Sequence, residues 1–229
     1  MLVAPPAIEE SLSAAEAALD AGHGLSGTGF WRAVATVKRQ PELTDRYADR
    51  MAAIDLAAFE QWALFKMPVG WGTALMILAT AAGLGLVGWS YYTTGELSSV
   101  VLFYLGLGVL LVSTHGLAHL VVGTAMGMRF THWFIGKISQ PQPGVKVDYS
   151  TYLRTPASRR AWMHASGAIT TKVTPFALIG AAVAADLPSW AVWGVPVVGV
   201  AAIVTDILWS TKHSDWMKFR REMEFAQTP

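Results

Sequence analysis

Residues 97–126 read LSSVVLFYLGLGVLLVSTHGLAHLVVGTAM, thirty consecutive residues without a single Asp, Glu, Lys or Arg. An α-helix needs about 20 predominantly apolar residues to cross the hydrocarbon core of a bilayer. The stretch is therefore predicted to be a transmembrane helix. It carries two histidines, His115 and His119, whose spacing of four residues places both rings on one face of the helix. Polar side chains are costly inside a membrane, so this pair indicates a functional site.

Three further apolar stretches are long enough to span a membrane, and they lie at residues 69–91, 161–185 and 190–209. Together with 97–126 they predict an all-α membrane protein with four transmembrane helices. The composition agrees, because 53% of the 229 residues are hydrophobic and only 14% are charged. Soluble domains average about 25% charged residues.

Composition also narrows the classes of function. The chain has no cysteine, which excludes disulfides, thiolate metal sites and cysteine nucleophiles. Any metal must be held by histidine, carboxylate, carbonyl or water. The formal net charge of +1 gives no overall field that would indicate a nucleic-acid partner. The lipid bilayer is the partner that the composition predicts.

The distribution of basic residues predicts the orientation of the chain. Lys and Arg are found before the first span, in the long joint between the second and third spans, and after the fourth span. The two short joints, between the first and second spans and between the third and fourth, carry none. Since basic loops remain in the cytoplasm, both termini and loop 127–160 are expected to be cytoplasmic.

These boundaries predict three parts. Residues 1–66 form a cytoplasmic N-terminal tail followed by an amphipathic helix, residues 67–211 form the four-helix transmembrane domain with its cytoplasmic loop 127–160, and residues 212–229 form a cytoplasmic tail. The amphipathic helix is expected over 41–66, where apolar residues recur at spacings of three and four. Its apolar face either packs against its own protein or lies at the membrane surface.

Two smaller elements are also expected. An Ala/Glu-rich helix is predicted between Ile8 and Ala21, within a tail that extends over residues 1–30. A hairpin is predicted around QPQPG at 140–144, because Val145, Val147 and Tyr149 alternate with polar residues as in a strand.

The ionisable residues inside the spans suggest a metal site. His115 and His119 lie about 18 and 22 residues from the outer end of the second span, and Asp206 lies about 16 residues into the fourth. At about 1.5 Å per residue these three could meet in the cytoplasmic half of the bilayer. Two imidazoles and one carboxylate form a three-ligand zinc set with a fourth position left for water. Lys172 falls in the same layer, and His164 lies at the entrance of the third span.

Three other interpretations remain open for these residues. The histidines could bond to neighbouring helices, or they could ligate a haem or a chlorophyll-type pigment. Asp206 could form a buried ion pair with Lys172 and hold no metal, because an unpaired aspartate in lipid is costly.

Across residues 98–215 the layout resembles the site-2 protease family of intramembrane zinc metalloproteases. HGLAH at 115–119 stands where that family has HExxH, SRRAWMHASGAITTKVTPF at 158–176 is similar to its segment of small residues, and VTDI at 204–207 is similar to its metal-binding aspartate motif. The resemblance implies that His115, His119 and Asp206 bind zinc. It also implies substrates that are single-span membrane proteins.

One departure from the family changes the predicted activity. The glutamate that follows the first histidine in HExxH takes a proton from zinc-bound water, and here the residue is Gly116. We therefore expect a site-2-protease-like protein that keeps a metal site, lacks ordinary peptidase activity and acts as a subunit or binding partner in a membrane complex. The alternatives are an active zinc protease with another general base and a haem- or pigment-binding membrane subunit.

Overall fold

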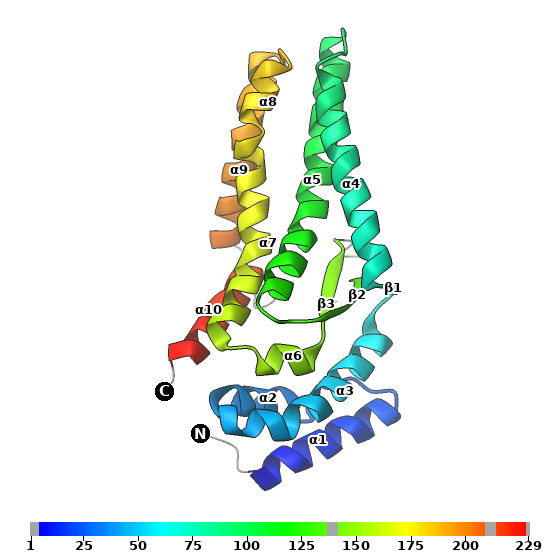
Figure 1. Cartoon of the computed structure of the whole chain (residues 1–229), viewed down its shortest axis with the longest axis vertical. Helices are drawn as coiled ribbons and strands as arrows, with labels where there is room; N and C mark the ends of the chain where they lie inside the picture. Colours follow the sequence, from blue (N-terminus) through cyan, green and yellow to red (C-terminus); the bar gives the residue numbers. More distant parts are fainter. Residues whose placement is uncertain (1–4, 137–141, 209–213, 228–229) are drawn as a thin grey trace. The chain divides into compact units, whose positions relative to one another are not determined.

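The structure is a computed structural model, and it describes residues 5–136, 142–208 and 214–227 (Figure 1). The chain divides into two compact units. The first comprises residues 1–67, 123–160 and 222–229, and the second comprises residues 68–122 and 161–221. The described residues are mostly helical, with a small sheet in addition.

The second unit is built from the apolar helices. These are α4 (Val69–Ser90), α5 (Glu96–Ala125), α7 (Ala157–Ala177) with α8 (Ile179–Ala184), and α9 (Ser189–Leu208). Four helical runs, with 157–184 counted as one, are long and apolar enough to cross a membrane. The four predicted spans are therefore confirmed as helices. Pro175 lies inside α7 near the point where that helix gives way to α8.

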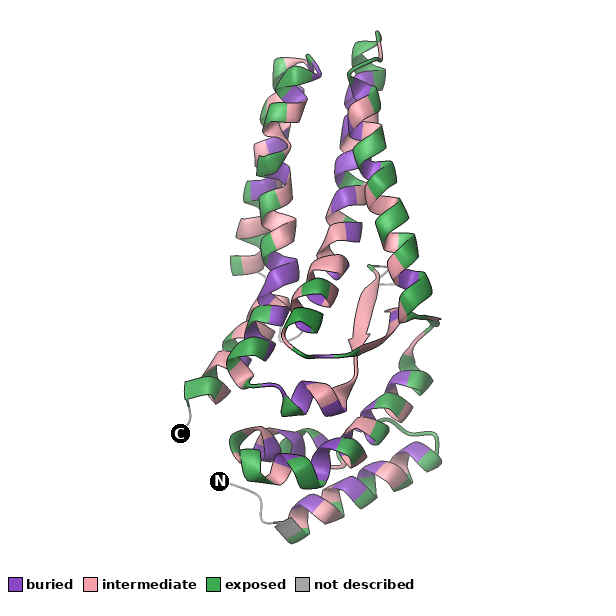
Figure 2. Ribbon diagram, in the orientation of Figure 1, coloured by how far each residue is buried: buried purple, intermediate pink, exposed green. Residues whose placement is uncertain are grey.

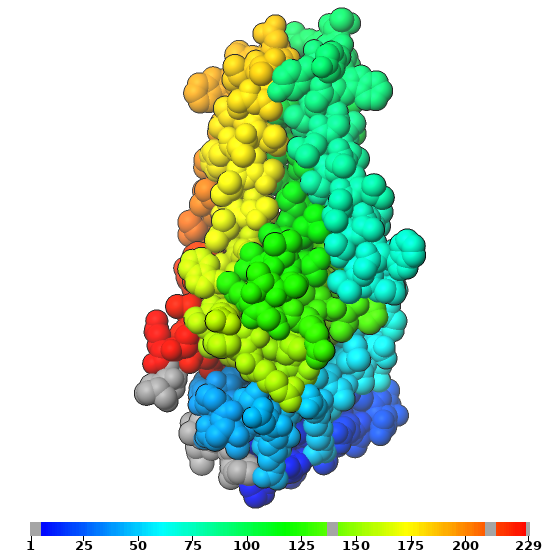
Figure 3. Space-filling model, viewed as in Figure 1, coloured from blue at the N-terminus to red at the C-terminus, as the bar shows by residue number. Residues whose placement is uncertain are grey.

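The outer surfaces of these helices are apolar, as a lipid environment requires. Trp71 and Leu78 of α4 are 75% and 66% exposed. On the face shown in Figure 3, α4 lies at the surface along its length. Figure 2 shows exposed positions on all of these helices. Burying so much apolar surface in lipid avoids the cost of hydrating it.

Contacts between the spans include close packing at small residues and hydrogen bonds that connect different helices. A methyl group on Gly106 of α5 would lie 2.7 Å from the Gly83 carbonyl oxygen of α4, so the two backbones touch where these glycines meet. The Tyr104 hydroxyl donates a hydrogen bond of 2.7 Å to the Ala191 carbonyl of α9. The spans of this unit are thus held by close packing and by hydrogen bonds between helices, which include a bond of 2.9 Å from the Thr80 hydroxyl of α4 to that of Ser113 on α5.

The first unit contains a helical layer at its N-terminal end. Its elements are α1 (Pro5–Asp20), α2 (Phe30–Arg39), the 3₁₀ turn η1 (Pro41–Leu43) and α3 (Thr44–Trp62). Their shared core consists of apolar residues at helical spacing, which are Ile8, Leu12, Ala15, Leu19, Phe30, Val34, Val37, Tyr47, Met51 and Ile54. Figure 2 shows the buried positions of α1 recurring on one side of the helix.

This layer differs from the sequence expectation in two places. The helix expected over 8–21 is present as α1, but residues 5–30 pack into a core and do not form a free tail. The second helix, α2, was not expected. The amphipathic helix expected over 41–66 ends at Trp62, and its apolar face packs against α1 and α2.

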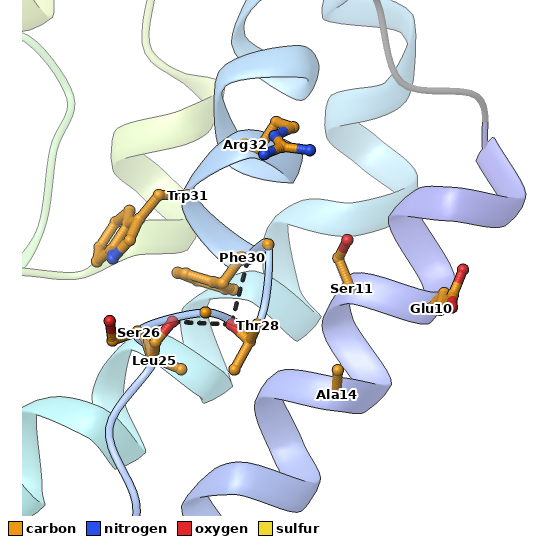
Figure 4. Close-up of a pocket in the computed structure, with 11 residues that line it drawn as sticks. Glu10, Ser11, Ala14, Leu25, Ser26, Thr28, Phe30, Trp31 and Arg32 are labelled. Atoms are coloured by element: carbon orange, nitrogen blue, oxygen red, sulfur yellow. Dashed lines mark hydrogen bonds between the residues drawn. The ribbon is translucent and has the colours of Figure 1, made fainter.

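The connection between α1 and α2 lines a hollow of about 670 Å³, drawn in Figure 4. The Thr28 hydroxyl donates to the Leu25 carbonyl at 2.9 Å and accepts from the Phe30 N–H at 3.3 Å, which starts α2. Gly27 and Gly29 have φ values of +82° and +81°, a conformation that favours glycine. These local features explain why the chain turns sharply here.

A three-stranded sheet of order β1-β2-β3 also belongs to the first unit, so the fold is not purely α-helical. Its strands are β1 (Phe65–Pro68), β2 (Phe130–Ile135) and β3 (Gly144–Val147). The second and third strands pair antiparallel, with Trp133 opposite Val145. The strand expected around Val145 and Val147 is confirmed, whereas residues 137–141, which include the start of the predicted QPQPG turn, lie outside the described residues. After β3, Asp148 caps α6 (Tyr149–Arg154) by accepting the Ser150 N–H at 3.0 Å.

The first unit also contains a fully buried carboxylate. Glu222 lies on the C-terminal helix α10 (Asp215–Gln227) and is 0% exposed. Lys38 and Arg160 reach its two oxygens at 2.5 and 2.7 Å, and the Tyr152 hydroxyl donates at 2.9 Å. Every oxygen of the carboxylate is therefore satisfied by a charged or polar donor, as burial of a charge requires.

Candidate metal centre

Among the described residues, three side chains of the second unit form a group that could hold a metal ion. They are His115 and His119 of α5 and Asp215, the first residue of α10. The two Nε2 atoms are 3.3 Å apart, and the Asp215 Oδ2 atom lies 3.2 Å from the Nε2 of His115 and 3.1 Å from that of His119. Three potential ligand atoms thus form a nearly equilateral triangle.

The size of this triangle fits zinc. Zinc binds imidazole nitrogen at about 2.0–2.1 Å and carboxylate oxygen at about 2.0–2.2 Å, in tetrahedral geometry. Ligand atoms of a tetrahedron with such bond lengths are separated by roughly 3.3–3.4 Å. The distances between the three atoms are within a few tenths of an ångström of these values. The same atoms could therefore bind one zinc ion with little movement.

The tautomers of the two rings follow from their other hydrogen bonds. The Nδ1 of His119 lies 2.7 Å from the Met163 carbonyl oxygen, which can only accept, so this nitrogen carries a proton. The Thr171 hydroxyl donates to the Gly167 carbonyl at 3.0 Å and therefore accepts from the Nδ1 of His115 at 2.9 Å. In neutral rings with these tautomers, both Nε2 atoms present a lone pair toward Asp215.

This arrangement places three electron-rich atoms within 3.3 Å of one another. Such atoms repel unless a metal cation lies between them or the rings take up further protons and become cationic. The hydrogen bonds from Nδ1 to a carbonyl and to a hydroxyl are the supporting contacts that metal-bound histidines usually make. The group therefore has ligand atoms and outer contacts of the kind that a zinc centre needs.

Without a metal, the surroundings keep Asp215 charged when the two rings carry protons on Nε2. Burial opposes its ionisation, but hydrogen bonds from the protonated His115 and His119 rings and the charge of the Lys218 ammonium outweigh burial and hold its pKa well below the usual range. Lys218 donates to the second oxygen, Oδ1, at 3.0 Å, which leaves Oδ2 directed at the histidines. The Ser214 hydroxyl accepts the Met217 N–H at 3.3 Å and so caps the start of α10.

Gly167 of α7 allows the close approach of His119. A methyl group built on Gly167 would lie 2.3 Å from the His119 Nε2 atom, which is far inside van der Waals contact. A glycine at this position therefore creates the space that the ligand atom occupies.

We expect Gly167→Ala to weaken zinc binding by about tenfold or more, because the added methyl displaces the His119 ring. Zinc titration against a competing chelator measures the change. Gly108→Ala is the matched control, since a methyl group there meets no atom within 4 Å. Equal zinc affinities in the two variants would contradict the role assigned to Gly167.

Thr171→Val should lower zinc affinity by about 10–100-fold, since valine cannot accept the His115 Nδ1–H bond that orients the ring. Thr174→Val is a suitable comparison on the same helix, because the Thr174 hydroxyl donates to the Thr170 carbonyl of its own helix at 2.8 Å. The same chelator competition applies. If Thr171→Val binds zinc as tightly as Thr174→Val, then Thr171 does not orient His115.

The sequence-predicted residues are only partly brought together. His115 and His119 lie in the group as predicted. Asp206 instead pairs with Lys172 at 2.5 Å, as in the ion-pair interpretation, and the carboxylate that joins the histidines is that of Asp215. His164 lies half-buried on α7, and among the described residues it belongs to no group of side chains that could hold a metal ion. Asp215 was missed because STKHSDW reads as a solvated segment after the last span.

Comparison of the chain with protein-family models, with curated proteins and with solved structures finds no match. The functional interpretation therefore depends on the residues and their geometry.

Proposed function

We propose that this chain is an integral membrane protein that binds one zinc ion through His115, His119 and Asp215. The observation that carries the proposal is the triangle of 3.1–3.3 Å between the three ligand atoms, combined with Nδ1 hydrogen bonds that leave both Nε2 lone pairs free for a metal. A donor set of two imidazoles and one carboxylate suits zinc and leaves one position open. A bound zinc would supply a Lewis acid at that open position.

The same site argues against ordinary peptide hydrolysis. The residue that follows His115 is Gly116, which has no side chain to take a proton from zinc-bound water. The Asp215 carboxylate would itself bind the metal, and Lys218 donates a hydrogen bond to it, so it is not free to act as a general base. We therefore propose a site-2-protease-like protein without peptidase activity, which acts as a subunit or binding partner for other membrane proteins.

The orientation is part of the proposal. The basic residues of the N-terminal segment, of loop 127–160 and of the C-terminal segment support a cytoplasmic location for both termini. Asp215 comes soon after Leu208, where the last span ends, so the zinc site would lie toward the cytoplasmic side of the membrane.

The test is the metal content of the protein purified in detergent without added metal. We expect about one zinc per chain, lost in His119→Ala and kept in His23→Ala, whose histidine is exposed in a loop. The same preparation is incubated with a panel of single-span membrane substrates, and no cleavage is expected. A metal-free wild type would contradict the zinc site, whereas cleavage that depends on His115 would contradict the loss of peptidase activity. Visible absorbance of a haem or pigment would contradict both.

A further inference from the structure

The ligands of the proposed zinc site come from two chemically different helices. His115 and His119 belong to the apolar helix α5, whereas Asp215 belongs to α10, in which six of the thirteen residues are charged (DWMKFRREMEFAQ). The start of α10 also packs on α7, because the Phe219 ring meets Trp162 edge to face at 5.5 Å and stacks on Trp216 at 5.1 Å. The docked position of α10 in this unit thus combines aromatic packing with the Asp215 contact.

The Asp215 contact is the part of this docking that depends on a cation. Lys218 neutralises the oxygen that faces away from the histidines, but Oδ2 faces two ring nitrogens at 3.1 and 3.2 Å. Against neutral rings this oxygen is repelled, and a metal ion turns that repulsion into two-sided attraction. The favourable free energy of metal binding is therefore available to hold the first turn of α10 in place.

We infer that zinc at this site fastens the start of α10 to α5 and α7, so that occupancy of the site controls whether this part of α10 is docked. The inference rests on the zinc site proposed above and assigns that site a regulatory role. By linkage, docking of α10 must strengthen zinc binding by the same factor by which zinc strengthens docking. The affinity of any membrane-protein partner that binds the α10 surface would then depend on whether zinc is bound.

The absence of native cysteine makes the test direct, because two introduced cysteines are the sole thiols for spin labelling. One label is placed at Val121→Cys on α5, where the native residue is 64% exposed. The other is placed at Met217→Cys, a half-buried position in the first turn of α10. Both positions lie in the second unit. Pulsed electron paramagnetic resonance measures the distance distribution between the labels with zinc bound and after chelation, and zinc content is determined on the same samples.

We expect a narrow distance distribution with about one zinc per chain, and a broadened distribution after chelation. Asp215→Asn should show the broad distribution with or without added zinc. The matched control removes both charges of the neighbouring ion pair, Asp206→Asn with Lys172→Met, and should behave as the wild type does.

Two results would overturn the inference, and they are distinguishable. If zinc is bound but chelation leaves the distance distribution unchanged, α10 is docked independently of the metal and the zinc site itself stands. If the wild type binds no zinc, the proposed metal site fails and the inference fails with it.

Discussion

Glu222→Ala is expected to lower the free energy of unfolding by about 3–5 kcal/mol, the usual cost of removing one partner from a buried ion pair. The carboxylate is fully buried, and it neutralises Lys38 and Arg160, which are themselves only 6% and 4% exposed. Alanine leaves two cations without their counter-ion in the core of the first unit. Titration of the detergent-solubilised protein with SDS, followed by circular dichroism, measures the loss of stability.

Glu60→Ala provides the matched control. Glu60 pairs with Lys66 at 3.7 Å, and both side chains are about half exposed, so we expect a change below about 1 kcal/mol. A Glu222→Ala protein that unfolds within about 1 kcal/mol of the wild type would show that the buried carboxylate does not hold the first unit together.

The same carboxylate predicts how stability depends on pH. Burial opposes ionisation of Glu222, but Lys38 and Arg160 outweigh burial and lower its pKa from 4.5 to about 2. A carboxyl whose folded pKa is depressed stabilises the folded state fully above pH 4.5, and this contribution is lost as the pH falls toward 2. At about 1.36 kcal/mol for each tenfold change in the acid constant, the contribution is about 3 kcal/mol.

Comparison of the wild type with Glu222→Gln across this range isolates the effect of Glu222 from that of other acids. The difference in unfolding free energy between the two proteins should be largest near neutral pH and should shrink steadily from pH 4.5 downward. A difference that stays constant from neutrality to pH 2 would contradict the depressed pKa.

The transmembrane helices could be predicted from sequence because each is a long apolar run, and length and hydropathy are local properties. The helix α2 was harder to predict from the sequence, although Phe30, Ala33, Val34 and Val37 share the helical spacing of a buried face. Only ten residues separate Gly29 from Gln40, and a run this short gives little periodicity. Its stability comes from packing against α1 and α3, which a local pattern does not reveal.

The candidate metal site also depends partly on local and partly on non-local information. The two histidines are local, since a spacing of four residues fixes one face of a helix. The third ligand depends on where the chain goes after the last span, and no local pattern marks Asp215. The depth of Asp206 along its helix favoured this residue as the third ligand. Its carboxylate instead pairs with Lys172, because a direct ion pair satisfies two charges inside an apolar layer.

Asp215→Asn is expected to lower zinc affinity by more than about 100-fold, since even the loss of an outer contact to a metal ligand costs about 10–100-fold. The amide keeps the size of the side chain but carries no negative charge and is a weak zinc ligand. The variant does not strand a buried charge, because Lys218 is one-third exposed. We therefore expect the protein to remain folded and to lose its metal.

The zinc content of three proteins purified in parallel tests the central claim most directly. They are the wild type, Asp215→Asn, and Asp206→Asn combined with Lys172→Met, which removes both charges of the ion pair at once. We predict about one zinc per chain in the wild type and in the double variant, and almost none in Asp215→Asn. Zinc retained in Asp215→Asn and lost in the double variant, or a wild type without zinc, would contradict the site formed by His115, His119 and Asp215.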